Sequence, residues 1–131
     1  MNIERSTPDV GYIDPEIFSA MGVSQMVSHA GLLHLSGVVA TSRGETLSPD
    51  DIGGQVTAVI DTIERLLASK GLDLSHLIAM TCYTTDIEGL GEHMDRFAAR
   101  FADHPPCSTW VEVRRLASPD YKLEIAAVAA L

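Results

Sequence analysis

The chain has 131 residues, a length that predicts one domain spanning residues 1–131. Hydrophobic residues make up 46% of it and charged residues 21%, the proportions of a globular chain and not of a disordered one. The net charge of −9 counts against nucleic acid or an anionic membrane as a partner, because phosphate binding relies on clustered Lys and Arg.

The absence of a targeting signal from the sequence and the spacing of its cysteines predict the compartment. No window approaches the roughly 18 to 20 apolar residues that span a bilayer, and the first residues hold no apolar signal core. Cys82 and Cys107 have neither metal-ligand nor redox spacing, so we expect two buried, reduced thiols. These features predict a cytoplasmic protein.

The N-terminal third of the chain predicts an arm followed by a hairpin. Residues 1–22 mix Pro, Gly and charges, which predicts a mostly irregular arm with one short edge strand. Residues 24–40 contain two strand-like runs, and the Ala30-Gly31 break between them predicts a tight turn. Both faces of the second run are largely apolar, so we expect this strand to be covered on both sides.

Residues 48–71 predict the clearest helix. Ser48 is a natural N-cap, apolar residues recur at helical spacing, and Gly71 stands where a C-terminal cap belongs. Gly53 and Gly54 in the first turn each cost about 1 kcal/mol relative to alanine, so we expect close packing there.

The C-terminal half predicts three strands and one helix. Residues 77–86 are rich in β-formers, and 88–104 place apolar side chains at helical spacing until Pro105 ends the helix. Residues 108–113 and 121–131 read as two further strands.

The predicted order is therefore β-β-α-β-α-β-β, an α+β fold with a single mixed β-sheet and both helices packed on one face. The other face still carries apolar residues such as Val38, Ala126 and Val128. A second copy of the chain is expected to cover it, so the sequence predicts a homo-oligomer.

Glu124 is the carboxylate best suited to a catalytic role. Its neighbours along the strand are apolar, and burial without a partner would raise its pKa, as suits a general acid, a general base or a water-activating group. The alternative is an exposed glutamate at a strand edge, or one paired with Arg114, Arg115 or Lys122.

Ser108 and Trp110 share one strand face, because they are two residues apart, and Glu112 continues it. An aromatic ring and a hydroxyl could form the wall of a cleft for a small ligand. Alternatively, Trp110 fills the core or a subunit interface, and Ser108 satisfies backbone groups at the start of the strand.

Motifs for metals, cofactors and nucleophilic catalysis are missing from the sequence. The five histidines show no metal-ligand pairing, so no metal is expected. The chain contains no nucleophile elbow, no P-loop and no Rossmann glycine run.

Segments over roughly residues 20–131 resemble the Rid family, the YjgF-type enamine and imine deaminases. The segments that carry this resemblance are GVSQMV, LHLSGVVA, IGGQVTAVIDTIERLLASKGLDLSHLIAMTCYTTDIEGL, FADHPPCSTWVEVRRLA and KLEIAAVAAL. The resemblance implies a chorismate-mutase-like fold, homotrimers with ligand clefts between subunits, and hydrolysis of reactive imines and enamines without metal or cofactor.

The resemblance also implies roles for individual residues that match the family. Glu124 stands at the glutamate that positions or activates water. Ser36 and Gly37 keep the Ser-Gly pair of the second strand. The water-handling half of the site is therefore expected to persist.

Three other positions depart from the family. Ser108 stands where the family has the arginine that grips the substrate carboxylate, Trp110 where it has a cysteine, and Val23 where it has a tyrosine. A charge-assisted arginine pair is worth roughly 1.5 to 3 kcal/mol, and serine cannot replace it. The substrate is therefore not expected to be a free α-imino acid.

The sequence supports two main functional hypotheses. The first is a cofactor-free hydrolase or deaminase that acts through Glu124 on a small imine, enamine or related C–N substrate. The second is a non-catalytic, ligand-binding trimer of the same fold. An RNA-cleaving role, which has also been attached to the family, is disfavoured by the net charge of −9.

Overall fold

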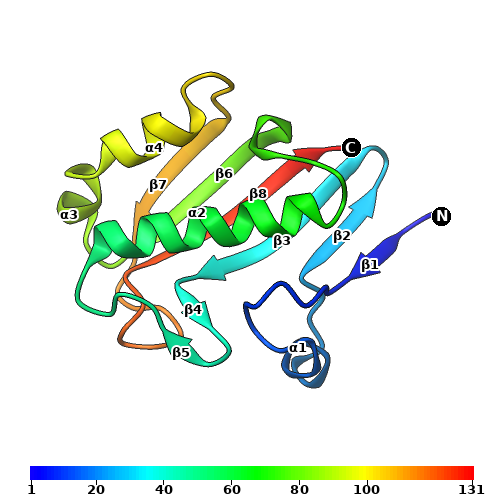
Figure 1. Cartoon of the computed structure of the whole chain (residues 1–131), viewed down its shortest axis with the longest axis horizontal. Helices are drawn as coiled ribbons and strands as arrows, with labels where there is room; N and C mark the ends of the chain where they lie inside the picture. Colours follow the sequence, from blue (N-terminus) through cyan, green and yellow to red (C-terminus); the bar gives the residue numbers. More distant parts are fainter.

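A six-stranded sheet in the order β1-β2-β3-β8-β6-β7 forms the centre of the computed structural model, which describes residues 1–131 (Figure 1). β6 and β7 run parallel and all other neighbouring strands are antiparallel, so the sheet is mixed, as predicted. Its strands are Glu4–Ser6 (β1), Met26–His29 (β2), Leu32–Val39 (β3), Leu77–Thr84 (β6), Cys107–Glu112 (β7) and Leu123–Ala130 (β8). The remaining strands, Thr41–Ser42 (β4) and Glu45–Thr46 (β5), form a separate small hairpin.

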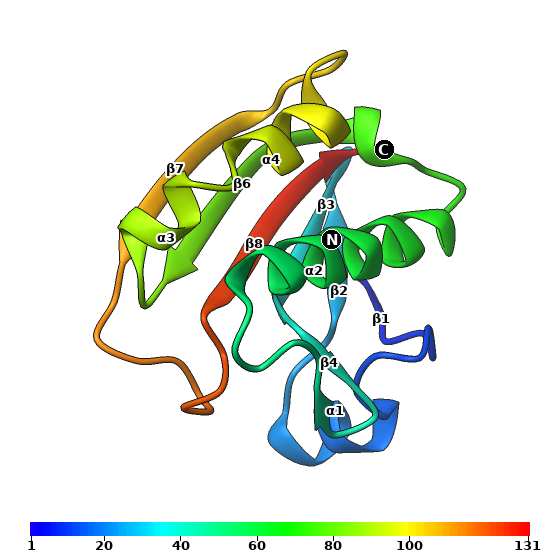
Figure 2. The ribbon, with the colours of Figure 1, turned by 60° about the vertical axis from the view of Figure 1, so that its left-hand side comes forward.

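Three helices lie on the same side of this sheet, and Figure 2 shows the opposite side without any helix. They are Ile52–Ala68 (α2), Ile87–Gly91 (α3) and Met94–Phe101 (α4). The apolar side chains of α2 that recur at helical spacing, from Val56 to Leu67, are fully buried against the sheet. The predicted α+β fold with its helices on one face is confirmed.

Strand β8 shows how the sheet divides into two faces. Leu123, Ile125, Ala127 and Ala129 are buried beneath the helices, whereas the intervening residues are half-buried and point to the other side. We call that other side the outer face. It comprises Glu124, Ala126 and Val128 of β8, the outward residues of β6 (Ala79, Thr81 and Tyr83) and those of β3.

Val38 does not lie on the outer face, which corrects the prediction from strict alternation. A bulge at Ser36 and Gly37 shifts the register between Leu35 and Val38, so both of those flanking residues point toward the helices. Val38 is fully buried as a result.

The predicted N-cap of the long helix was wrong. Asp51 takes the N-cap position of α2, while Ser48 has a positive φ of 50° in the preceding turn. The expected close packing is confirmed, because a Cβ on Gly53 would lie 2.6 Å from the His93 ring, and Gly54 packs against Ser48. At the other end, Gly71 adopts the left-handed conformation with φ 72°, two residues beyond the C-cap.

Two helical segments differ from the prediction. Residues 88–104 form two helices, because the chain breaks between α3 and α4 and His93 becomes a new N-cap. The arm at residues 1–22 contains the expected edge strand β1 but also a helix, Pro15–Met21 (α1), which Asp14 caps and Gly22 ends. A short 3-10 helix (η1), Leu74–His76, precedes β6.

Both cysteines are free thiols, but only Cys82 is buried. Cys107 is exposed on the edge strand β7, where no neighbouring strand covers it, so the expectation of two buried thiols was wrong. None of the helices combines the length and apolar character needed to cross a membrane.

Candidate active site

Glu124 lies on the outer face near the start of β8. Its partners across the two ladders are Val39 of β3 and Tyr83 of β6. The flanking residues Leu123 and Ile125 are fully buried on the helix side, which fixes the carboxylate on the outer side.

Gly37 gives the Glu124 side chain its space. A Cβ on Gly37 would lie 2.7 Å from Glu124 Cδ and collide with Oε2, so the carboxyl group rests directly on this glycine. Because Gly37 belongs to the bulge, the bulge and the carboxylate form one local unit. Bulges often stand beside active sites because they redirect side chains. The structure therefore brings together Gly37 and Glu124, two of the residues singled out from the sequence.

The electrostatic setting of Glu124 is that of an unpaired, partly desolvated carboxylate. It forms no hydrogen bond and no ion pair with any other side chain of the chain, so pairing with Arg114, Arg115 or Lys122 is not observed. Burial raises its pKa above the ordinary value of 4.5. Such a group holds a proton at higher pH than an exposed glutamate and has free lone pairs for a water molecule.

Tyr12 is a neighbour of Glu124 that the sequence did not reveal. Its hydroxyl accepts a hydrogen bond of 2.9 Å from the backbone N–H of Val39, the ladder partner of Glu124. Burial, and more weakly the negative charge of Glu124, raise the pKa of the Tyr12 phenol, which stays protonated near neutral pH. Tyr12 lies in the N-terminal arm, where no periodicity indicates a contact with a distant strand.

Within one chain, neither Ser36 nor Val23 forms a hydrogen bond with Glu124. The Ser36 hydroxyl donates to the Ser24 carbonyl oxygen at 2.7 Å, and its backbone pairs with Gln25, so Ser36 anchors the bulge. Val23 follows α1 with 40% of its surface exposed and does not contact Glu124 through any hydrogen bond. Both remain predictions as substrate-binding residues.

Ser108 and Trp110 lie on the opposite face of the sheet from Glu124. Their parallel partners are Met80 and Cys82, which are buried on the helix side. Within one chain, these two residues and Glu124 therefore do not form a single pocket.

Trp110 packs against α4 instead. Its ring centroid is 4.9 Å from that of Phe97, and its indole N–H donates to Ser108 Oγ at 3.2 Å. Burial raises the pKa of the neighbouring Cys82 thiol to about 12, and the nearby Ser108 hydroxyl lowers it slightly. The shared face predicted for Ser108 and Trp110 is confirmed, and the packing matches the alternative in which Trp110 borders the core.

A shallow apolar groove of about 250 Å³ opens beside Trp110. Phe97 and Phe101 of α4, Pro105 and Pro106 line it together with Ser108. The groove offers apolar contact but no charged group, so it can hold an apolar side chain or ring and supplies no chemistry by itself.

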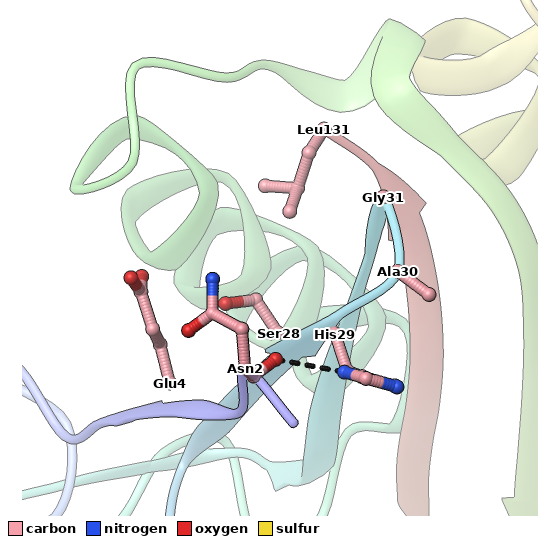
Figure 3. A pocket seen from close by; sticks show the side chains of 7 residues that line it. All are labelled: Asn2, Glu4, Ser28, His29, Ala30, Gly31 and Leu131. Atoms are coloured by element: carbon pink, nitrogen blue, oxygen red, sulfur yellow. Dashed lines mark hydrogen bonds between the residues drawn. The ribbon is translucent and has the colours of Figure 1, made fainter.

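The largest cavity has a volume of about 450 Å³ (Figure 3). It lies between the N-terminal strand and the β2–β3 turn, where His29 Nδ1 hydrogen-bonds the Asn2 carbonyl oxygen at 2.7 Å. Leu131, which lines this cavity, follows the far end of β8, roughly 20 Å of strand from Glu124. Its size therefore does not mark it as the reaction site.

Metal-binding clusters are not formed by the fold. No group of three or more His, Cys, Asp or Glu side chains converges closely enough to hold a metal ion. Glu124 itself can transfer a proton and accept hydrogen bonds.

Comparison with known proteins identifies the group to which this arrangement belongs. A family model described as endoribonuclease L-PSP matches residues 15–131. Among individual proteins, the chain is 28% identical over 106 residues to a RutC family protein of Sulfurisphaera tokodaii, covering 80% of this chain and 84% of that protein. It is also 30% identical over 79 residues to protein DfrA of Myxococcus xanthus, a match that spans only 60% of either chain.

A solved structure agrees over the whole length. Rv2704 of Mycobacterium tuberculosis, described as a member of the YjgF/YER057c/UK114 family, superposes with a TM-score of 0.81 at 26% identity, covering 99% of this chain and 100% of that one. The shared fold and the matched residues lead to one assignment. The chain belongs to the endoribonuclease L-PSP family, also known as the YjgF or Rid family.

Proposed function

We propose that this protein is a cofactor-free hydrolase of the deaminase type, acting on a small imine, enamine or related C–N substrate at Glu124. One observation carries the proposal. The Glu124 carboxylate is half-buried on the outer face, rests on the Gly37 bulge, and has no partner in its own chain. The reaction class rests on the resemblance to the YjgF-type enamine and imine deaminases.

The proposed reaction needs only water and proton transfer. The ionised Glu124 takes a proton from a water molecule as the water oxygen adds to the carbon of the C=N bond. The proton then passes to the nitrogen and gives a carbinolamine. Glu124 next takes the hydroxyl proton of the carbinolamine and returns it to the nitrogen as the C–N bond breaks, so that a carbonyl compound and ammonia leave. One imine and one water thus give one carbonyl compound and one ammonia, without oxidation or reduction.

The proposed substrate class rests on the absence of an arginine at position 108, which is Ser108 in this chain. The family resemblance implies an arginine for the substrate carboxylate at this position, and here a neutral hydroxyl accepts a hydrogen bond from Trp110. No guanidinium replaces it in the groove beside Trp110. We therefore propose that free α-imino acids are poor substrates.

We also propose that the protein assembles as a homo-oligomer, a trimer by family resemblance, with the reaction site at the subunit interface. The helix-free outer face supports this proposal, since apolar groups such as Ala126 and Val128 line a groove of about 220 Å³ on it. We place the protein in the cytoplasm.

A second candidate function is non-catalytic binding of a small ligand by the same trimer. The apolar groove beside Trp110 favours it, because that groove is separate from Glu124 and lined mainly by aromatic and proline side chains. A ligand held there would make no contact with a group capable of proton transfer.

A rate measurement separates the two functions. Pentan-1-imine, which lacks a carboxylate, is produced in situ from pentylamine by an amine oxidase, and ammonia release is followed against the spontaneous rate. We expect the wild-type protein to accelerate release, and Glu124→Gln to lose about 100-fold or more of the acceleration, since a general base contributes about 10² to 10⁴.

Glu112→Gln is the matched control. Glu112 lies on the same sheet but on the helix side, where its carboxylate accepts the Ile87 N–H at 3.1 Å, a role that a glutamine oxygen retains. This variant should keep the wild-type rate. Absence of acceleration by the wild-type protein, or equal rates for Glu124→Gln and wild type, would remove the basis for the hydrolase and favour the binding function.

A further inference from the structure

Three basic side chains gather at one end of the sheet in a protein that is otherwise strongly acidic. Arg114, Arg115 and Lys122 lie in the β7–β8 connection, although the whole chain has only nine Lys and Arg against eighteen Asp and Glu. None of the three forms an ion pair, whereas Arg43 and Arg100 each pair with carboxylates. With Asp120 as its one carboxylate, the connection carries a net positive charge.

The two arginines line a pocket of about 220 Å³ together with hydroxyl groups. Thr85, Ser118 and Tyr121 contribute these hydroxyls. Arg115 donates through Nε to the Leu116 carbonyl oxygen at 3.2 Å, which leaves its terminal nitrogens available. Two guanidinium groups with neighbouring hydroxyl donors are the chemistry that recognises a carboxylate or a phosphate.

The pocket is held in place by a buried amide. Gln55 of α2, which is fully buried, donates to the Asp120 carbonyl oxygen at 2.8 Å and accepts from the Lys122 N–H at 2.8 Å. On the other side, Thr85 N–H bonds the Lys122 carbonyl oxygen at 3.2 Å. The connection thus has a fixed course, which lowers the entropic cost of binding an anion.

The pocket lies one step along the ladder from Glu124. Thr85 follows Tyr83, the partner of Glu124, by two residues, and Lys122 precedes Glu124 by two residues. Two residues of strand correspond to about 7 Å. An extended substrate could therefore reach the pocket with one end while its C=N group lies at Glu124.

We propose that the Arg114–Arg115 pocket binds an anionic group, carboxylate or phosphate, that the substrate carries at the end opposite its C=N carbon. The inference rests on the proposed function for the role of Glu124, and it names the substrate class. The preferred substrate is an imine with its anion at the far end of a short chain. An α-imino acid has its carboxylate next to the C=N carbon and cannot span from Glu124 to the pocket.

A binding experiment tests the pocket without any reaction. Backbone amide resonances are followed by NMR while the protein is titrated with glutarate and, separately, with inorganic phosphate. Saturable shifts at Thr85 and Tyr121 are expected for wild type with at least one probe, and the stronger probe identifies the anion. Arg114→Gln combined with Arg115→Gln should weaken binding at least tenfold, and Lys70→Gln, an exposed charge change outside the pocket, should not.

A rate experiment tests the substrate class. The imine of 5-aminopentanoate is compared with that of pentylamine, which lacks the carboxylate. Wild type and Lys70→Gln should prefer the anionic imine by at least tenfold in kcat/KM, and the double arginine variant should bring this ratio close to one. Equal kcat/KM values in wild type, together with no shifts from either probe, would overturn the proposal.

The outcomes separate the pocket from the reaction. Suppose that no imine is hydrolysed, but glutarate or phosphate still shifts the amide resonances of Thr85 and Tyr121 in an arginine-dependent way. The anion pocket is then supported and the proposed hydrolase activity is refuted. If a single-stranded oligonucleotide binds this connection more tightly than both small probes, a small anionic substrate is the wrong occupant and the inference is overturned.

Discussion

At the scale of single residues, the role proposed for Glu124 depends on what its neighbours lack. Gly37 has no side chain, which lets the carboxylate fold over the bulge, and no cation neutralises the carboxylate. Desolvation without compensation raises its pKa. The apolar pattern around Glu124 could be read from the sequence, whereas the contacts with Gly37 and Tyr12 could not, because they depend on the register of β3 with β8 and on the course of the arm.

Gly37→Ala should therefore impair the reaction more than the fold. The new Cβ would collide with the end of the Glu124 side chain, which can rotate away, so the variant should stay folded. Displacing the carboxylate by about 1 Å can cost about 100-fold in rate, and we expect a loss in kcat/KM of that order for pentan-1-imine.

Gly91→Ala serves as its control, because a Cβ at Gly91 meets no atom within 4 Å. This variant should retain the wild-type kcat/KM. Wild-type activity in Gly37→Ala would contradict the placement of the reacting carboxylate over the bulge.

At the scale of elements, side chains of α2 both cover the sheet and position the β7–β8 connection. Periodicity alone predicted the helix and its apolar side, because these depend on local spacing. The helix ends were harder to predict. Serine is a favoured N-cap residue, yet Asp51 and not Ser48 takes that position. The packing of Gly53 against His93 accompanies the break between α3 and α4. Such tertiary contacts leave no periodic signal.

The same limit applies to Ser108 and Trp110. Alternation along β7 showed that the two side chains share a face, but not which one. The parallel register with Met80 and Cys82 decides it, and that register cannot be inferred from β7 alone.

Gln55→Met should show how much α2 contributes to the β7–β8 connection. The substitution keeps the volume similar but leaves the Asp120 and Ser48 carbonyl oxygens and the Lys122 N–H without their partner. We expect a loss of about 2 to 3 kcal/mol in the free energy of unfolding, measured by urea denaturation.

Thr62→Val is the matched control on the same helix. The Thr62 hydroxyl donates to the Ala58 carbonyl oxygen at 3.0 Å and accepts from Arg65 at 3.2 Å, both on the same helix. Because neither bond reaches the connection, removal of the hydroxyl should cost only about 1 kcal/mol. Similar losses for the two variants would show that Gln55 does not fix the connection.

At the scale of the whole molecule, the helices protect one face of the sheet and leave the outer face bare. The prediction that one face lacks helices followed from counting amphipathic helices against strands, and the structure agrees. The sequence could not show that Glu124 belongs to this bare face and Trp110 to the covered one, since that depends on the packing of four strands. Under the proposed assembly, the reacting group lies where subunits meet.

Val128→Glu should therefore break the assembly. A charge at this half-buried outer-face position would be unpaired in the interface, at a cost of about 3 to 5 kcal/mol. We expect wild type to sediment as a homotrimer and the variant as a monomer with an unchanged circular dichroism spectrum. Met94→Glu, an equally drastic change at an exposed position of α4 on the helix side, should stay trimeric. A monomeric wild type would refute the assembly directly.

The pH dependence of kcat/KM for pentan-1-imine, in wild type and in Glu124→Gln, tests the central role of Glu124 most directly. The general base must be ionised, so wild-type activity should rise with pH through the pKa of Glu124. Since burial raises that pKa, the midpoint should lie above 4.5. Glu124→Gln should be slow at every pH and show no such rise. A midpoint at or below 4.5, or the same rise in Glu124→Gln, would contradict the account.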